Sequence, residues 1–510
     1  MPPLALWGGH ECTVNRIGGT WRDQTVLSGH QNRIGDLDLF AGLGLQAIRY
    51  PVLWERTERT SGNYDWSWSD ERLARLRALG IKPIVGLLHH GSGPAWTDLL
   101  DPGFANGLAT FAGAVAARYP WIEAWTPVNE PLTTARFSAL YGHWYPHKRD
   151  EGAFWTALLN QIDGTRLAMA AIRAVNPRAR LIQTEDFGHT FATGPCRAQA
   201  EHENQRRLMT WDLLCGRVTA DHPLYARLAA FGLEDRLKRI AADPCPPVIG
   251  LNHYVTSDRF LDHRLERYPP STHGGNGALA YADVEAVRVI DPAPAGWMQH
   301  LHHLWRRYRL PIAITECHLG CTREEQLRWL AECWDAAVMA RQGGVEVEAV
   351  TVWSLLGSHD WDTLLTQANG RYESGVFDLG EGPIRPTALA TLATVLSTQG
   401  RADLPIAQEA GWWRSPRRLT YPPYRVDPMA AAPPRRTRTA AIRLEGTPTA
   451  DFLEECNVRG LRIATRSAGG PCWMAVSGEQ TWPQGRNLDL ALDDALALRR
   501  GSDTSSQKYA

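Results

Sequence analysis

The sequence predicts an α/β chain whose main part folds as a (β/α)8 TIM barrel. Short apolar segments alternate with longer segments of helical periodicity from the N-terminus to about residue 400. The apolar segments are hydrophobic on both faces, which is typical of the strands of a buried parallel sheet. Eight strand–helix repeats over this length match a (β/α)8 barrel with some long loops.

Eight segments predict the barrel strands: 4–8 (LALWG), 46–51 (QAIRYP), 82–88 (KPIVGLL), 122–128 (IEAWTPV), 180–184 (RLIQT), 247–252 (PVIGLN), 311–315 (PIAIT) and 348–354 (EAVTVWS). Helical periodicity between them predicts helices at 32–43, 70–79, 153–175, 297–309 and 323–341. A doubly wound parallel sheet is the alternative. Its first strand is normally followed by a G-x-G-x-x-G turn, and the stretch WGGHECTVN does not match that pattern.

Composition excludes several classes of partner. Lys and Arg number 54 against 55 Asp and Glu, so the net charge of −1 favours neither nucleic acid nor an anionic membrane as a partner. The N-terminus lacks the pattern of a signal peptide, and no apolar run is long enough to cross a bilayer. Nine cysteines without a pairing framework favour a cytoplasmic location. The 21 Trp are mostly expected in the core, although indole faces also stack on sugar rings.

We expect no cofactor and no metal. Cys317, His318 and Cys321 lie close together in ECHLGC, but no second Cys/His pair follows at zinc spacing. The barrel is expected over residues 1–400. A Pro- and Arg-rich linker is expected over 401–443, and a weakly structured tail over 444–510. Within 439–465 the pattern resembles strand, helix and strand, without a nucleotide-binding glycine motif.

Candidate catalytic residues follow from the barrel, because the loops after its strands form the active-site face. The polar residues expected there are Glu11 and Asn15, Arg49, His89 and His90, Asn129 and Glu130, Glu185 and Asp186, Asn252 and Tyr254, Glu316, and His359, Asp360 and Trp361. Hydrolysis of a glycosidic bond needs one carboxylic acid and one carboxylate on opposite sides of the bond. Glu130 and Glu316 end two different strands and meet this requirement. Arg49 is expected beside the ionised carboxylate.

Six strand ends resemble those of glycoside hydrolase family 1 in the same order. WTPVNEP (125–131) is similar to the family's W-x-T-x-N-E-P motif, and AITE (313–316) to its I-T-E motif. The other similar segments are LLHH (87–90), AIRYPVLW (47–54), GLNHY (250–254) and VWSLLGSHDW (352–361). The resemblance covers roughly residues 4–397 and suggests a divergent branch that is sometimes fused to a domain resembling dTDP-4-dehydrorhamnose reductase. The tail would then be a possible remnant of such a domain.

The resemblance implies a role for each matched residue. Glu130 would be the general acid/base and Glu316 the nucleophile, with Arg49 and Tyr254 supporting Glu316. Asn129 would hydrogen-bond the 2-hydroxyl of the sugar. The residues expected to contact the sugar besides Asn129 are Glu11, His89, Trp353 and Asp360.

Departures from the family motifs leave the sugar open. Glu11 replaces the usual glutamine of the first strand, Asp360 replaces a glutamate, and Cys317-His318 replaces Asn-Gly after the nucleophile. The leading interpretation is a retaining exo-acting β-glycosidase of the glucosidase, galactosidase or fucosidase type, whose partner is a small β-glycoside or an oligosaccharide. The alternatives are an endo-acting glycanase and a catalytically silent sugar-binding barrel.

Overall fold

The computed structural model describes residues 2–380, 382–425, 441–445, 462–464 and 473–476. The chain forms two compact units. The first comprises Met1–Val289, Ala293–Trp305 and Leu310–Pro423, and the second comprises Ile290–Pro292, Arg306–Arg309 and Tyr424–Ala510. Among the described residues, no helix is both long and apolar enough to cross a membrane.

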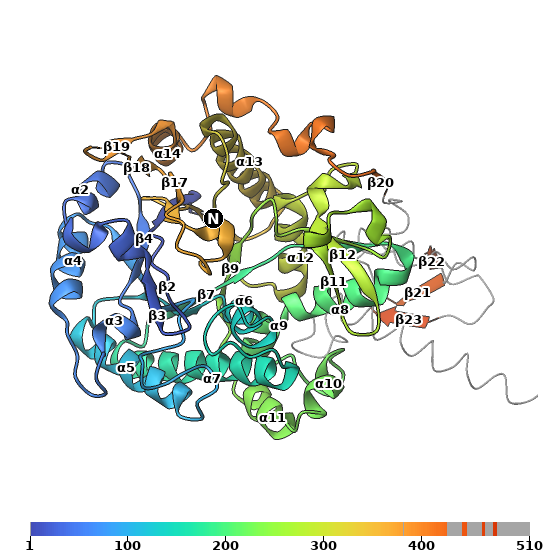
Figure 1. The fold of residues 1–510 in the computed structure, drawn as a ribbon, viewed down its shortest axis with the longest axis horizontal. Helices are drawn as coiled ribbons and strands as arrows, with labels where there is room; N and C mark the ends of the chain where they lie inside the picture. The colour runs from blue at the N-terminus through green and yellow to red at the C-terminus, as the bar shows by residue number, and fades with distance from the viewer. Residues whose placement is uncertain (1, 381, 426–440, 446–461, 465–472, 477–510) are drawn as a thin grey trace, which may run out of the picture. The chain divides into compact units, whose positions relative to one another are not determined.

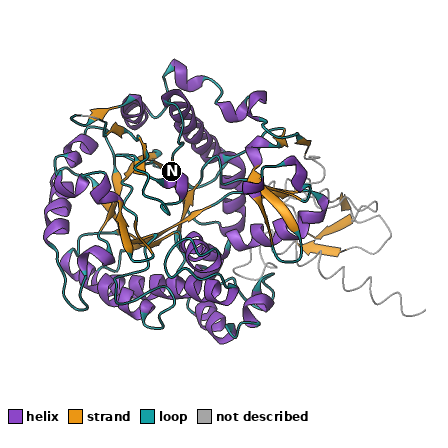
Figure 2. Cartoon of the chain, in the orientation of Figure 1, coloured by secondary structure: helices purple, strands orange, loops and turns teal. Residues whose placement is uncertain are grey.

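Eight parallel strands in the first unit close into a barrel (Figures 1 and 2). Around the barrel they follow chain order, with β1 pairing with both β4 and β15. They are β1 (Ala5–Gly9), β4 (Ala47–Pro51), β5 (Lys82–His89), β6 (Ala124–Asn129), β7 (Arg180–Asp186), β9 (Val248–Asn252), β14 (Ile312–Cys317) and β15 (Val347–Val352). Each matches one predicted strand to within two residues at either end. The predicted barrel is therefore confirmed, and the doubly wound alternative is wrong because the sheet has no open edge.

The strands are connected by helices that surround the barrel. The α-helices are α1 (Gln24–Leu27), α2 (Asp36–Ala41), α3 (Trp54–Thr57), α4 (Ser67–Ala78), α5 (Phe104–Arg118), α6 (Pro131–Ala135), α7 (Glu151–Val175), α8 (Arg197–Arg207), α9 (Met209–Leu214), α10 (Tyr225–Ala229), α11 (Glu234–Ala242), α12 (Trp297–Tyr308), α13 (Arg323–Gln342) and α14 (Ala388–Gln399). Each of the five predicted helical segments overlaps one of these helices. The two long helices α5 and α7 lie side by side (Figure 1).

One layer of side chains fills the barrel interior below the mouth formed by the C-terminal ends of the strands. Every strand contributes one apolar residue to it: Trp7, Ala47, Ile84, Ala124, Ile182, Val248, Ala313 and Ala349. Side chains alternate between the two faces of a strand, so residues two positions further along a strand return to the interior. Arg49 follows Ala47 in this way and is buried above the layer. The apolar layer thus supports the polar residues at the mouth.

Shorter strands form small additional sheets within the first unit. They are β2 (Val14–Ile17) with β3 (Thr20–Asp23), the set β8 (Thr190–Ala192), β10 (Arg259–Asp262), β12 (Ala280–Glu285) and β11 (His273–Gly275), β16 (Ser358–His359) with β17 (Tyr372–Glu373), and β18 (Phe377–Asp378) with β19 (Arg385–Pro386). The set containing β12 matters for the site, because the following turn carries Arg288 to the cavity described below.

Part of the predicted linker has defined structure. Three short 3-10 helices follow α14, at Pro405–Gln408, Trp412–Arg414 and Pro416–Arg418. Trp412 N donates a 3.0 Å hydrogen bond to Glu325 of α13, and Trp413 Nε1 donates a 2.8 Å hydrogen bond to Glu332 of the same helix. These bonds and a buried Trp413 hold the segment to the outside of the barrel.

The described residues of the second unit include two small parallel sheets. One pairs β13 (Ile290–Asp291) with β20 (Tyr424–Arg425). The other has the order β22 (Arg462–Ala464), β21 (Ala441–Glu445), β23 (Trp473–Val476). The strands β21 and β22 coincide with the two strand-like segments of 439–465, and the helix-like segment between them lies outside the described residues.

Candidate active site

The last residues of strand β6 are not paired with the neighbouring strand β7. Pro127 has no N–H for a sheet hydrogen bond, and the pairing of β6 with β7 stops at Trp125. Side chains bridge the two strands beyond this point: Thr126 Oγ1 donates to Ile182 O at 2.8 Å, and Gln183 Nε2 donates to Val128 O at 2.9 Å. The pairing of β6 with β5 continues to Asn129. The strand end is therefore held on both sides while its backbone turns.

Glu130 occupies the turn after β6 in a left-handed conformation, with φ of 44°. This conformation costs a non-glycine residue on the order of 1–2 kcal/mol, so other contacts must hold it. Pro131 begins α6, where a proline needs no N–H partner. The Glu185 carboxylate accepts hydrogen bonds from Leu132 N at 2.8 Å and Thr133 N at 3.1 Å. Glu185 therefore anchors the turn that carries Glu130.

The Glu130 carboxyl is buried among groups that favour its protonated form. Burial raises its pKa well above the usual range, and the negative charge of Glu316 is the next largest cause. Asn252 Nδ2 donates a 2.6 Å hydrogen bond to Glu130 Oε1, which acts in the opposite direction. His90 Nε2 lies 3.7 Å from Glu130 Oε2. Because burial lowers the pKa of His90 to about 3, this imidazole is neutral and does not offset the rise.

Glu316 on β14 has different neighbours. Arg49 Nη1 donates a 2.7 Å hydrogen bond to Glu316 Oε1, and the same nitrogen donates to Thr315 O at 2.9 Å. The Tyr254 hydroxyl donates to the other oxygen, Glu316 Oε2. A guanidinium and a phenol both stabilise the charged form of a carboxylate. The cavity thus pairs a carboxyl group that favours its proton with a second carboxyl group that accepts hydrogen bonds from a guanidinium and a phenol.

Asn129 contacts side chains from three other strands of the barrel. Its Oδ1 accepts from Arg49 Nη2 at 2.5 Å and from Thr184 Oγ1 at 2.8 Å. Its Nδ2 lies 3.3 Å from Nε2 of both His89 and His90. With its oxygen occupied twice, the orientation of the Asn129 side chain is set before any ligand binds.

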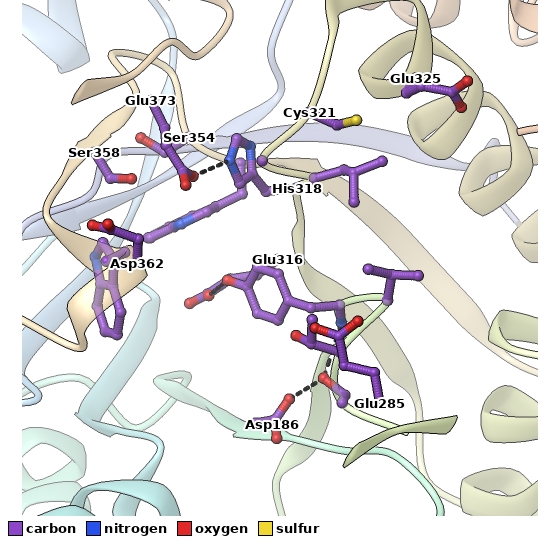
Figure 3. A pocket seen from close by; sticks show the side chains of 18 of the residues that line it. Asp186, Glu285, Glu316, His318, Cys321, Glu325, Ser354, Ser358, Asp362 and Glu373 are labelled. Atoms are coloured by element: carbon purple, nitrogen blue, oxygen red, sulfur yellow. Dashed lines mark hydrogen bonds and ion pairs between the residues drawn. The ribbon is translucent and has the colours of Figure 1, made fainter. Parts of the chain in front are cut away.

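A cavity of about 900 Å³ opens over these residues. Of the predicted site residues, Glu11, Glu130, Tyr254, Glu316 and Trp353 line it. Figure 3 shows Glu316 between Asp186 and the pair formed by His318 and Glu373, whose Nε2–Oε2 distance is 3.2 Å. Glu130 and Glu316 therefore face the same cavity, together with His318, which departs from the family motif.

The remaining predicted sugar contacts lie at different depths. Beneath the mouth, the ring of His89 stacks on Trp353 with centroids 5.7 Å apart, and the Arg49 guanidinium lies 4.8 Å from the Trp353 ring centroid. Asp360 is buried but does not line the cavity. Its Oδ2 pairs with Arg22 Nη2 at 2.5 Å, and its Oδ1 accepts from Arg371 N at 2.8 Å. Both oxygens of Asp360 are thus bound to protein groups.

Glu11 lies in the cavity wall, and no cationic side chain in the described part of the chain is in close contact with it. Its Oε1 accepts from Thr13 N at 2.9 Å and from Thr13 Oγ1 at 2.6 Å, and His89 Nε2 lies 4.0 Å away. Burial raises the pKa of Glu11 to about 7, against the effect of the two Thr13 hydrogen bonds. This side chain therefore changes its protonation state near neutral pH.

Several contacts at the site were not predicted from the sequence. Asn252 was recognised as a polar strand end, but its bond to Glu130 depends on the distance between β9 and β6. Arg288, Trp412, Arg417 and Arg418 line the outer cavity, where the Arg288 guanidinium lies 4.0 Å from the Trp412 ring centroid. The excess of tryptophan was the only feature of the sequence that pointed to the contact between Arg288 and Trp412.

Comparison with known proteins places the chain in a family. The profile described as glycosyl hydrolase family 1 matches residues 12–372. A family 1 β-glucosidase from Thermotoga maritima superposes with a TM-score of 0.62 at 16% identity, covering 79% of this chain and 99% of the other. A complex of the Thermotoga maritima β-glucosidase with galacto-hydroximolactam gives 0.64, with the same identity and coverage.

An AHE enzyme from Alicyclobacillus herbarius gives a TM-score of 0.58 at 19% identity, covering 69% of this chain and 82% of the other. At these identities the superpositions support the fold, and the profile match supports the family. No fused reductase domain is confirmed by these matches. The chain belongs to glycosyl hydrolase family 1 and is an O-glycosyl hydrolase.

Proposed function

We propose that this protein is a retaining exo-β-glycosidase, with Glu130 as general acid/base and Glu316 as nucleophile. The observation that supports this assignment is the contrast between two buried glutamates in one cavity. Burial and a neighbouring charge raise the pKa of Glu130, whereas Arg49 and Tyr254 both donate hydrogen bonds to Glu316. A pair of carboxyl groups whose surroundings separate their protonation states can divide acid and nucleophile roles between them.

In the first step, Glu130 protonates the glycosidic oxygen while a Glu316 oxygen attacks the anomeric carbon. The bond from carbon to the leaving oxygen breaks, and an ester bond to Glu316 forms with inverted configuration. In the second step, Glu130, now ionised, removes a proton from water as the water oxygen attacks the same carbon. The ester breaks, Glu316 regains its charge, and the product has the original β-configuration.

Arg49 and Tyr254 assist by controlling the charge on Glu316. The carboxylate charge decreases as the ester forms and returns as the ester breaks, so these donors stabilise it as nucleophile and as leaving group. Asn129 is proposed to donate its Nδ2 protons to the 2-hydroxyl of the sugar, since its oxygen already accepts from Arg49 and Thr184. Such a bond contributes to rate when it strengthens in the transition state.

Glu11, His89 and Trp353 are proposed to contact the sugar itself. Asp360 is proposed to act with them. Because both of its oxygens are bound to protein groups, it would act through Arg22 or after exchanging one of these bonds for a bond to the sugar. Exo action is favoured by the segment 405–418, whose Trp412 and Arg417 line the outer cavity and narrow the space for a long substrate. The silent-barrel alternative is disfavoured because both glutamates are present and lie in the electrostatic settings that the reaction needs.

Turnover of aryl β-glycosides with gluco, galacto, fuco, manno and xylo configurations tests this proposal. We expect at least one to be hydrolysed, with Glu130→Gln and Glu316→Gln each reducing kcat by several orders of magnitude. Azide should restore activity to Glu130→Ala on an activated substrate and give a β-glycosyl azide, because azide needs no base to attack the ester. An α-azide would exclude retention, and wild-type turnover by both Gln variants would exclude the mechanism.

A further inference from the structure

A buried cluster of two histidines and an aspartate lies behind Tyr254 and outside the reaction cavity. His253 follows β9, Asp258 precedes β10, and His300 belongs to α12. Their exposed fractions are 1%, 5% and 2%. One potential ligand atom from each lies within 4.8 Å of the other two. Within the described ranges, no other group of three His, Cys, Asp or Glu side chains meets this criterion.

The His253 ring is oriented as a metal-binding histidine usually is. Its Nδ1 lies 2.8 Å from Phe187 O, and a carbonyl can only accept, so Nδ1 carries the proton. The lone pair of a neutral imidazole is then on Nε2. Metal-bound histidines commonly use their second nitrogen in this way, to donate to a carbonyl or carboxylate.

The contact between His300 and Asp258 is close but not aligned as a hydrogen bond. His300 Nε2 lies 3.1 Å from Asp258 Oδ1, yet this buried nitrogen makes no hydrogen bond of acceptable geometry. Asp258 Oδ1 instead accepts from His189 N at 2.7 Å. Two ligands of one tetrahedral ion, each about 2.0–2.2 Å from it, lie at a similar separation and point toward the ion instead of each other.

An aromatic shell surrounds the cluster. The centroids of the His253 and His300 rings are 4.4 Å apart, and the His253 ring is 4.8 Å from Trp297 and 5.9 Å from Trp329. These rings cover the cluster and separate its side chains from bulk solvent.

We propose that His253 Nε2, His300 Nε2 and an Asp258 oxygen bind one divalent transition-metal ion, with Zn²⁺ as the best match. Two imidazole nitrogens and one carboxylate are a frequent Zn²⁺ ligand set, and they leave one tetrahedral position for a water molecule. The cluster shares no residue with the lining of the reaction cavity. The ion therefore takes no direct part in glycoside cleavage and acts by positioning the side chains around it.

The location of the ligands indicates what the ion would stabilise. His253 and Asp258 bracket the turn 254–257, which is closed by a 3.0 Å hydrogen bond from Ser257 N to Tyr254 O. His300 fixes both ends of this turn to α12. Tyr254 donates to the nucleophile candidate Glu316. Metal binding would thus hold Tyr254 in place. Only the activity readout of this positioning effect rests on the function proposed above.

Metal analysis of the purified full-length chain tests the site directly. The protein is stripped with a chelator, dialysed, and reloaded with Zn²⁺ or Co²⁺. We expect close to one equivalent of tightly bound metal by mass spectrometry, a visible Co²⁺ absorption typical of nitrogen and oxygen ligands in low coordination, and a higher Tm with metal than without. A chain that retains no stoichiometric metal and whose Tm does not respond would overturn the proposal.

Variants of the proposed ligands test where in the protein the ion binds. His300→Gln and Asp258→Asn keep side chains of similar size, and the asparagine still offers an oxygen to His189 N. Both should lose the bound metal and the Tm response. The matched control is His222→Gln, which alters another buried His–Asp pair with Nε2 3.2 Å from Asp212 Oδ2 and should keep the metal. Metal bound equally by His300→Gln would place it elsewhere and contradict the site.

Activity measurements separate this proposal from the proposed function. If the chain hydrolyses aryl β-glycosides, removal of the metal should lower kcat more than it changes KM, because Tyr254 donates its hydrogen bond to the nucleophile candidate Glu316. Hydrolysis without stoichiometric metal would contradict the metal site alone. Stoichiometric metal without hydrolysis would contradict the proposed function alone.

Discussion

Asn252 Nδ2 donates a 2.6 Å hydrogen bond to Glu130 Oε1, so a residue of β9 contacts the carboxyl group that β6 presents. This bond is the main contact that lowers the pKa of Glu130 against the effect of burial. The value of the Glu130 pKa therefore depends on β9, a strand that is distant in sequence from β6. The bond also orients the carboxyl toward the cavity that Glu316 shares.

Removing the Asn252 side chain tests this relationship. In Asn252→Ala the pKa of Glu130 should rise further, because a bond that stabilises its charged form is lost. The acid form would then persist to higher pH, and the basic limb of the kcat/KM profile should shift upward. A profile of kcat/KM against pH measures the shift. Asn160→Ala, which removes an amide away from the site, should leave the limb unchanged, and a downward shift would contradict the assignment of Glu130 as acid.

Replacing Arg49 should affect the nucleophile most strongly. Arg49→Met keeps much of the side-chain volume and removes the charge next to Glu316. We expect kcat/KM to fall by about 10²–10³-fold, the usual effect of losing one preorganised electrostatic donor. Steady-state kinetics with an activated aryl glycoside measure the loss. Arg22→Met, which removes a different buried guanidinium, should cost less if Asp360 acts only indirectly.

Glu11 should make sugar binding depend on pH. Its pKa of about 7 means that the carboxylate form increases as the pH rises through neutrality. A carboxylate accepts stronger hydrogen bonds from sugar hydroxyls than a carboxylic acid does. The Ki of an uncharged competitive inhibitor should therefore fall between pH 6 and pH 8 in the wild type. In Glu11→Gln the same Ki should be flat, and a parallel fall would assign the effect to another group.

Trp412 should select leaving groups. Trp412→Ala removes an indole from the outer cavity but keeps the backbone N–H that binds Glu325. An aromatic contact of about 0.5–1.5 kcal/mol predicts a KM increase of roughly 2–10-fold for bulky aryl leaving groups. Hydrolysis of a methyl glycoside should change little. Trp96→Ala removes a tryptophan that does not line the cavity and serves as the control.

The apolar layer of the barrel should dominate its stability. Ile182 is buried among the equivalent residues of neighbouring strands. Ile182→Ala should destabilise the fold by about 2–5 kcal/mol through lost burial and a residual cavity. Urea unfolding monitored by tryptophan fluorescence measures this change. A loss below that of an exposed substitution such as Leu167→Ala would contradict the central position of this layer.

The strand and helix pattern of the sequence determined the barrel, because periodicity and alternation report burial directly. It also placed Glu130 and Glu316 at strand ends, since in this fold a strand end is the mouth. Of the polar residues predicted at this face, Glu11, Glu130, Tyr254 and Glu316 line the cavity, whereas Glu185 and Asp360 do not. Pro127 and Pro131 could be recognised as the end of a strand.

Only the tertiary structure decided which of these polar groups touch. Glu185 and Glu130 both follow barrel strands, yet Glu185 binds the first N–H groups of α6 while Glu130 faces the cavity. Asp360 binds Arg22, and Trp412 reaches the cavity from a segment that composition alone marked as linker. These outcomes depend on strand register, turn conformation and distances of a few ångströms between chain segments. No local pattern encodes them, because each contact arises from two stretches that meet only after the barrel closes.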